Sequence, residues 1–590
     1  MYISEGVNKC YCYVCETVWD KTQKKYSTPG KCVGRLNSDK SLLPNGYLSR
    51  LFFLESTSPM SLDEYEKRVI ETVVNKYGDG VREKASKPSA KTLSEDFMTA
   101  RAVFIGPELV FGMITKRYRI RSLLEKSFGE KTAKDILSMA WYVAMEGNAL
   151  SDSDSWLDYY ENPRGSGMSS QDVSRLLDAI SYDGMMTFYK LWLKEAVRHA
   201  GKADKVLYDI TSISYYGSGI DAVEYGYNRD HESLPQVNYA LLCMRTTAMP
   251  LFAWTLNGSI MDMATLDTTL QFLRKLQYAP DCLMMDRGFG SKDNISGMFK
   301  NGHTFLQAVK VNANWIFNII DASEGERFIP DSKIEDGGRT YYASTSDCRW
   351  VRIKSGTGKE RVVVHICDGS ARDKYVSDEK GATVIAQYPC RVHILFCQDL
   401  VGSQHDRFMD KLKAEHDRLV SDDGAEVKKE YEKYIKVSRK KYARHRTIEY
   451  DADMIAGHKN KYAGHICFIT NDKTIATASD ALKEYSTRDY IEKDFDEMKN
   501  CLDMKRIRVW SDPRMRSRLF IQFIAEIYMR EIRVCLRRSH ECKKLTRKQI
   551  FSNIKSIYRV KFKGKYRDVY PELTKQQRHI LEALGVRYSG

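Results

Sequence analysis

Three carboxylate residues lie where a folded chain could bring their side chains together. Asp209 and Asp286 each follow a short apolar run that predicts a buried strand ending at the carboxylate. Side chains at strand ends of an α/β sheet commonly build the functional site. Glu492 lies within residues 485–499, a stretch without Gly or Pro that predicts one continuous helix with an apolar stripe along one side. We therefore expect this helix to pack against the sheet and to bring Glu492 to the two aspartates.

Carboxylates at one place repel one another, and this repulsion raises their pKa values unless cations neutralise them. Oxygen ligands of this kind select Mg²⁺, with Mn²⁺ as a substitute. Two such ions, roughly 3.5–4 Å apart, activate a nucleophile and stabilise the leaving oxygen of a phosphodiester. The pattern of Asp209, Asp286 and Glu492 thus predicts metal-dependent phosphoryl transfer, with these three residues as catalytic metal ligands.

Two cations bracket the glutamate on the same side of the predicted helix. Arg488 precedes Glu492 by four residues and Lys499 follows it by seven, so both could hold phosphates or developing charge. Considered alone, the stretch is also compatible with a surface helix whose Arg488–Glu492 pair contributes roughly 0.2–0.5 kcal/mol. The two upstream aspartates favour the functional interpretation.

Other nucleic-acid chemistries lack their motifs in this sequence. No His-x-His pair occurs, as a rolling-circle nuclease would need, and no histidine is followed by Arg at the third position, as in tyrosine recombinases. A Gly-x-x-x-x-Gly-Lys-[Ser/Thr] phosphate loop is also absent, which argues against an ATP-driven motor.

Composition indicates a folded protein with a polyanionic partner. The 590 residues carry a net charge of +15, which favours nucleic acid. The first residues do not resemble a signal peptide, and polar or charged residues interrupt the most apolar runs, so we expect a cytoplasmic protein that does not span a membrane. The 14 cysteines show no secreted framework. Cys12-x-x-Cys15 leaves zinc binding open beside the alternative of reduced strand cysteines.

The expected elements predict an α/β layer interrupted by a long insertion. Residues 201–310 read as three strands, a helix, a strand, a helix and a strand, which specifies a mixed sheet. A β-rich and then helical insertion follows, and its dense charge run Glu426–Lys441 is expected on a helix. Basic residues interleaved with aromatics near the C-terminus are a further DNA-binding signal, with a solvated tail as the alternative.

The helix stretch also resembles a known family. Tyr485-x2-Arg488-x3-Glu492-x6-Lys499 matches the Y-(2)-R-(3)-E-(6)-K signature of bacterial insertion-sequence transposases of the insertion-sequence-4 type. Tyr208-Asp209-Ile-Thr211 resembles the first aspartate motif of that family, and Asp286-Arg-Gly-Phe resembles the second. The Gly226-Tyr-Asn-Arg-Asp230 stretch is most similar to its larger subgroup. The run Arg514-x-Arg516-x-Arg518 is more basic than the resemblance leads us to expect, and it has no assigned role.

The resemblance implies a DDE transposase that cleaves DNA at terminal inverted repeats and transfers the strands to target DNA. It implies a triad of Asp209, Asp286 and Glu492 that binds two Mg²⁺, and a homodimer that brings two transposon ends together in a synaptic complex. It also implies contacts to the transposon end from Tyr485, Arg488, Lys499 and Arg287, and a bacterial, nucleoid-associated location. Whether the ends form hairpins stays open.

Two other functions remain as alternatives. One is a catalytically silent, transposase-derived DNA-binding or regulatory protein. The other is a general RNase H-like nuclease, which leaves the long insertion and the terminal regions unexplained.

The fold class that we expect is an α/β RNase H-like catalytic core with a β-rich insertion, a helical N-terminal DNA-binding region and a basic C-terminal region. The expected boundaries are a small β region (1–55), a helical DNA-binding or dimerisation region (56–200), the first part of the core (201–310), the insertion (311–455), the second part of the core with the glutamate helix (456–536) and the basic C-terminal region (537–590).

Overall fold

A computed structural model describes residues 100–201, 205–311, 314–367, 375–377, 381–438, 446–456, 461–562 and 568–588, together with Lys67 and the backbone of six short strands near the N-terminus. Four of these strands form an antiparallel sheet in the order β1-β2-β5-β6, and β3 pairs with β4. Their bounds are β1 Tyr2–Gly6, β2 Lys9–Cys15, β3 Val18–Asp20, β4 Lys25–Ser27, β5 Gly30–Leu36 and β6 Leu42–Pro44. The side chains of Cys12 and Cys15 lie outside the described residues, as do residues 56–99 of the expected helical region apart from Lys67.

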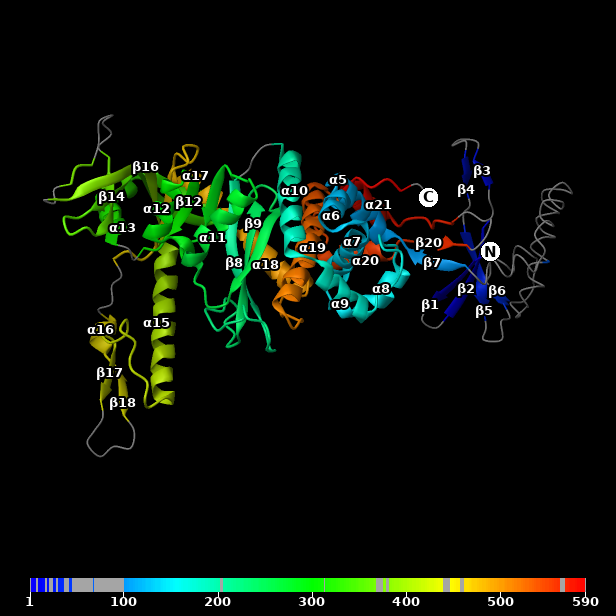
Figure 1. Ribbon diagram of the computed structural model, residues 1–590, viewed down its shortest axis with the longest axis horizontal. Helices are drawn as coiled ribbons and strands as arrows, with labels where there is room; N and C mark the ends of the chain where they lie inside the picture. Colours follow the sequence, from blue (N-terminus) through cyan, green and yellow to red (C-terminus); the bar gives the residue numbers. More distant parts are fainter. Residues whose placement is uncertain are drawn as a thin grey trace.

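A ten-stranded mixed sheet extends from the middle of the molecule, at β8 and β9, to one end, at β14 and β16 (Figure 1). Its strand order is β10-β9-β8-β11-β12-β19-β16-β14-β13, with β15 on β14. Strand β8 is parallel to β11, and β11 is parallel to β12, whereas the other pairs are antiparallel. The predicted α/β layer with a mixed sheet is therefore confirmed. Its first part comprises β8 Lys205–Ser214, β9 Gln236–Met244, β10 Pro250–Asn257, α11 Asp262–Lys275, β11 Cys282–Met285, η3 Arg287–Phe289, α12 Lys292–Lys300 and β12 Phe305–Val309.

The inserted strands extend this same sheet. Strand β19 (His465–Thr470) pairs with β12 on one side and with β16 (Thr383–Phe396) on the other. Strand β14 (Arg339–Lys354) continues the sheet beyond β16 over almost its whole length. The remaining elements of this part are α13 Asn314–Ala322, α14 Glu324–Arg327, η4 Pro330–Ser332, β13 Lys333–Asp336 and β15 Glu360–Ile366.

The predicted helix over the charge run Glu426–Lys441 is wrong in its described part. The helix α15 (Gln398–Ser421) ends before it, and the run forms turns and strand β17 (Ile435–Ser438). The physical reason is a small separate core, in which Tyr431 and Ile435 are buried with residues of α15. Helix α15 leads away from the sheet, with β17, β18 (Thr447–Tyr450) and α16 (Ala452–Ala456) beside it (Figure 1).

The helical region is closed by the C-terminal part of the chain. Strand β20 (Tyr558–Lys561) pairs antiparallel with β7 (Arg101–Phe104), and α19 (Asp512–Arg538) packs against α7 and against β10 of the sheet (Figure 1). The other elements are η1 Glu108–Gly112, α5 Met113–Arg117, α6 Ile120–Phe128, α7 Glu130–Glu146, η2 Leu150–Asp152, α8 Asp154–Tyr159, α9 Ser170–Ala179, α10 Tyr182–Ala200, α20 Arg547–Lys555 and α21 Lys575–Leu584. No helix among the described residues is long and apolar enough to cross a membrane.

The basic run Arg514-x-Arg516-x-Arg518 forms the first turns of α19 and has a structural role in this arrangement. Arg514 donates two hydrogen bonds of 2.7 Å to the carboxylate of Asp178 on α9. Arg518 is buried and donates to the carboxylate of Asp503 at 2.8 Å and to the carbonyl of Arg506 at 2.9 Å. Two of the three arginines of this run thus join α19 to neighbouring segments.

The single helix predicted over residues 485–499 is also wrong. Helix α17 (Ala478–Ser486) ends at a turn through Thr487 and Arg488, and α18 (Asp489–Cys501) begins after it. At this turn the Thr487 hydroxyl donates to the carbonyl of Glu484 at 2.6 Å, a local bond that competes with continued helix. Because the chain turns here, α17 contacts β14 and β16 whereas α18 contacts β8.

Candidate active site

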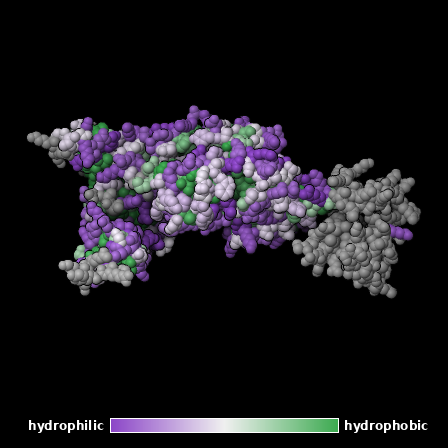
Figure 2. Space-filling model, turned by 60° about the horizontal axis from the view of Figure 1, so that its bottom comes forward, coloured by the Kyte–Doolittle hydropathy of each residue, from purple (hydrophilic) through white to green (hydrophobic). Residues whose placement is uncertain are grey.

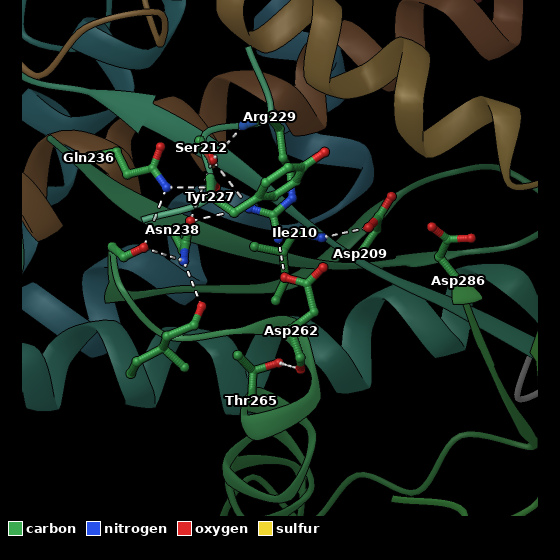
Figure 3. Close-up of polar contacts among 12 residues, drawn as sticks. Asp209, Ile210, Ser212, Tyr227, Arg229, Gln236, Asn238, Asp262, Thr265 and Asp286 are labelled. Atoms are coloured by element: carbon green, nitrogen blue, oxygen red, sulfur yellow. Dashed lines mark hydrogen bonds and ion pairs between the residues drawn. The ribbon is translucent and has the colours of Figure 1, made fainter. Parts of the chain in front are cut away.

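Two neighbouring parallel strands place the aspartates side by side. In the pairing of β11 with β8, Met285 lies opposite Tyr208, so Asp286 follows beside Asp209 (Figure 3). Asp286 comes directly after β11, as expected. Asp209 lies in the middle of β8 and not at its end, because β8 pairs with β9 as far as Ser214.

Arg488 brings all three carboxylates together. Its Nη1 lies 3.4 Å from Asp209 Oδ2 and 3.8 Å from Asp286 Oδ2, and its Nη2 lies 2.5 Å from Glu492 Oε1. The hydroxyl of Tyr485 donates to Asp286 Oδ1 at 2.6 Å. The Arg488 side chain is 17% exposed, whereas that of Glu492 is 51% exposed. Three carboxylates from three separate elements thus surround one guanidinium at the end of α17 and the start of α18.

The buried apolar stripe of α18 fixes this arrangement. Ile491, Phe495 and Met498 are buried in the main core, at spacings of four and three residues. Their burial leaves the adjoining side of the helix, with Glu492, facing solvent at the edge of the site. The sequence predicted this stripe correctly.

Burial sets the electrostatics of the aspartates. Desolvation raises the pKa of Asp209 to about 7, although the positive charge of Arg488 acts in the opposite direction. Burial and the nearby Asp286 carboxylate raise the pKa of Tyr485, so this hydroxyl stays protonated and acts as a donor. For Arg488, burial disfavours the charged form, but the surrounding tyrosine and carboxylates outweigh it and raise the pKa.

The three carboxylates are the type of ligand that a divalent metal ion prefers, but their side chains are not close enough together to coordinate one. Among the described residues, no three His, Cys, Asp or Glu side chains are grouped closely enough to hold a metal ion. Yet the donor set is carboxylate oxygen, which suits Mg²⁺. All three carboxylates already face one cation, and Asp209 is desolvated enough that its charged form needs one. The assignment of these residues as metal ligands stays a prediction.

The two remaining predicted site residues are Lys499 and Arg287. Lys499 binds Asp230 through its Nζ, at 2.6 Å and 2.8 Å from the two carboxylate oxygens, and is only 11% exposed. Arg287 is exposed at the start of η3, directly after Asp286. The structure therefore groups Tyr485 and Arg488 with the three carboxylates, and it leaves Arg287 facing solvent and Lys499 in a separate ion pair.

Sequence reasoning missed a second arginine beside the site. Arg229 forms an ion pair with Asp262 and donates from Nη1 to Ser212 Oγ and Asn238 Oδ1, both at 3.2 Å (Figure 3). Its positive charge also favours the ionised form of Asp209 and so lowers the pKa of that carboxyl against the effect of burial. In the sequence, the Gly226–Asp230 stretch stands out only by its family resemblance. No spacing rule pairs Arg229 with a residue 33 positions away.

The comparisons with known proteins give little beyond this geometry. No protein-family model matches the sequence, and no curated protein matches it. Among solved structures, the chain is similar to a piggyBac transposase in a synaptic complex with hairpin DNA, with 12% identity and a TM-score of 0.25. The match covers 47% of this chain and spans 62% of the length of that neighbour.

Proposed function

We propose that this protein is a DDE transposase of the insertion-sequence-4 type with an RNase H-like core. Asp209, Asp286 and Glu492 would hold two Mg²⁺, with Mn²⁺ as a substitute. The observation that carries the proposal is the meeting of these three carboxylates, from β8, from the end of β11 and from α18, around Arg488. The spacing of Tyr485, Arg488, Glu492 and Lys499 in the sequence supports the same class.

The reaction would cleave DNA at the ends of an insertion sequence and then join the freed strand to target DNA. When bound, the ions would activate water and later a 3′-hydroxyl, and would stabilise the leaving oxygen. Tyr485 holds the Asp286 carboxylate in place, while Arg488 is close enough to neutralise charge at the site. The exposed Arg287 beside Asp286 is suited to contact a DNA phosphate.

The proposed partners are double-stranded transposon ends and target DNA. A net charge of +15 supports a polyanionic partner, and the face shown in Figure 2 is largely hydrophilic. Cut-and-paste transposition requires two ends to be held together, so we propose a homodimer in a synaptic complex. A bacterial cytoplasm, in association with the nucleoid, is the location that goes with this function.

One observation favours a second candidate function, that of a catalytically silent, transposase-derived DNA-binding or regulatory protein. Arg488 lies among the carboxylates, at the position where cations would be needed. If this guanidinium permanently took the place of the metal ions, the three carboxylates would still come together, but the protein would not cleave DNA. This candidate predicts DNA binding without cleavage in either Mg²⁺ or Mn²⁺.

The test is cleavage of a labelled duplex that carries the element's own ends, taken from the sequence flanking its gene. Wild-type protein with Mg²⁺ should nick at the element boundary, and Asp209→Asn, Asp286→Asn and Glu492→Gln should each lower the rate by at least about 1,000-fold. Asp496→Asn is the matched control, because Asp496 is an exposed carboxylate on the same helix. Tight binding without nicking by the wild type would support the silent candidate instead.

A further inference from the structure

We propose that Arg229 and Asp230 are positioning residues that hold the three carboxylate-bearing elements of the site in register. We further infer that Lys499 belongs to this framework through its ion pair with Asp230. The inference rests on the proposed function, because it assigns a role around the same three carboxylates. The inference is carried by the contacts of the loop formed by residues 226–232.

Arg229 links two strands of the sheet to the start of a helix. Its guanidinium reaches Ser212 on β8 and Asn238 on β9, each at 3.2 Å, and pairs with Asp262 at the first residue of α11 (Figure 3). Its backbone N–H also donates to Ser212 Oγ, at 3.3 Å. Ser212 lies three residues after Asp209 on the same strand, so Arg229 fixes the segment that carries this aspartate.

Asp262 connects Arg229 to the turn that carries Asp286. A Cβ atom placed on Gly288 would lie 3.0 Å from Asp262 Oδ2, so the turn passes close to this carboxylate. Gly288 belongs to η3, which begins directly after Asp286. Asp262 therefore contacts Arg229 and also lies beside the turn that follows the second aspartate, while Arg229 and Asp262 both lie on one side of Asp209 in Figure 3.

The loop itself is held firmly on β8. Asn228 is buried and donates to Ser214 Oγ at 3.1 Å, while its side-chain oxygen accepts the backbone N–H of Asp230 at 2.8 Å. Gln236 Nε2 donates to the carbonyl of Tyr227 at 2.8 Å. Because these bonds fix both sides of Arg229, the carboxylate of Asp230 has a defined position relative to Asp209.

Asp230 extends the framework to the helix of the third carboxylate. Both of its oxygens accept from Lys499 Nζ, at 2.6 Å and 2.8 Å. Lys499 lies about two turns after Glu492, roughly on the same side of α18. Helix α18 is thus tied to the sheet at its start by Arg488 and near its end by Lys499. A phosphate brought to the Lys499 ammonium would lie beside the Asp230 carboxylate, whose negative charge disfavours that contact.

The framework and the DNA-contact role predict different effects. A lysine that binds a phosphate contributes to DNA affinity and to its salt dependence, and its loss lowers the salt slope by about one unit. A positioning pair instead affects the rate once DNA is saturating. Disturbing residues that orient metal ligands typically costs about 10–100-fold in activity or metal affinity.

The experiment compares Asp230→Asn, Lys499→Met and the exchanged pair Asp230→Lys with Lys499→Asp, using Asp496→Asn as the control. We expect both single variants to cleave about 10–100-fold more slowly at saturating DNA, with unchanged DNA affinity and salt slope. The exchanged pair should cleave at least about tenfold faster than either single variant, because it restores the opposite charges. Hydrogen exchange of α18 amides in DNA-free protein should be faster in the single variants and slower again in the exchanged pair.

The two readouts separate the framework from the proposed function. Hydrogen exchange needs neither DNA nor cleavage, so it tests the framework even if the wild type proves to be catalytically silent. Unchanged exchange of α18 in Asp230→Asn would overturn the framework. A weaker DNA affinity with a reduced salt slope in Lys499→Met, at an unchanged saturating rate, would overturn it in favour of DNA contact.

Discussion

Arg488 is the residue on which the charge balance of the site depends. It contacts Asp209, Asp286 and Glu492, and its guanidinium takes the part that a metal ion would take in a loaded site. A protein that assembles its carboxylates around an internal cation avoids their mutual repulsion before DNA and metal arrive. In the proposed function, the same cation would compete with a metal ion for the carboxylates.

Replacing Arg488 by alanine tests this competition. Arg488→Ala should destabilise the metal-free protein by about 3 kcal/mol, because the partly buried carboxylates of Asp209 and Asp286 lose their cation. Added Mn²⁺ should raise the Tm of the variant more than that of the wild type, since no guanidinium has to be displaced. Thermal scans over a series of Mn²⁺ concentrations measure both effects. Lys493→Ala, an exposed cation on the same helix, is the control, and an equal Mn²⁺ response in both variants would contradict the account.

At the scale of elements, the strands and the helix stripe of the site follow from local sequence. Four of the predicted features, the strands around Asp209 and Asp286, the helix Lys292–Lys300 and the apolar stripe of α18, depend on short-range periodicity, and the structure contains them. The break between α17 and α18 was missed, because it depends on which strands each half contacts. Likewise, the pair of Arg229 with Asp262 joins two loops whose approach is set by the sheet order.

A buried histidine between two of the inserted strands should make the stability of the folded protein fall at acid pH. His393 on β16 lies opposite Thr345 on β14, is fully buried and is 3.0 Å from the Thr345 hydroxyl. Burial, assisted by the charge of Arg391, lowers the pKa of His393 to about 4. In the unfolded chain the histidine takes up a proton below about pH 6.5. The folded protein should therefore lose stability through this group as the pH falls from about 6.5 to about 4, and not further below.

A glutamine at this position removes the titration while keeping a polar side chain. The Tm difference between wild type and His393→Gln should shift in favour of the variant as the pH falls through this window. Thermal scans between pH 7.5 and pH 4.5 measure it, and other titrating groups cancel because both proteins share them. A Tm difference that stays constant across these pH values would show that His393 is not held neutral by burial.

At the scale of the whole molecule, one sheet connects the site to regions that are far apart in the sequence. The inserted strands lie at one end of the described chain, and the helical region, closed by β20 and α21, lies toward the other (Figure 1). The described part of the predicted basic C-terminal region (537–590) packs with that helical region. Composition indicated a polyanionic partner, but no local pattern could show that the C-terminal segment returns to residues 101–104, because this pairing spans more than 450 positions.

We propose that Asp209, Asp286 and Glu492 act as one metal site when DNA is bound. The most direct test is the number of Mn²⁺ ions bound per protomer, measured by electron paramagnetic resonance in complex with a duplex of the element's ends. We predict two ions for the wild type and for Asp496→Asn, and the loss of at least one in Asp209→Asn, Asp286→Asn and Glu492→Gln. The same number of ions, bound with the same affinity in all five proteins, would contradict the claim.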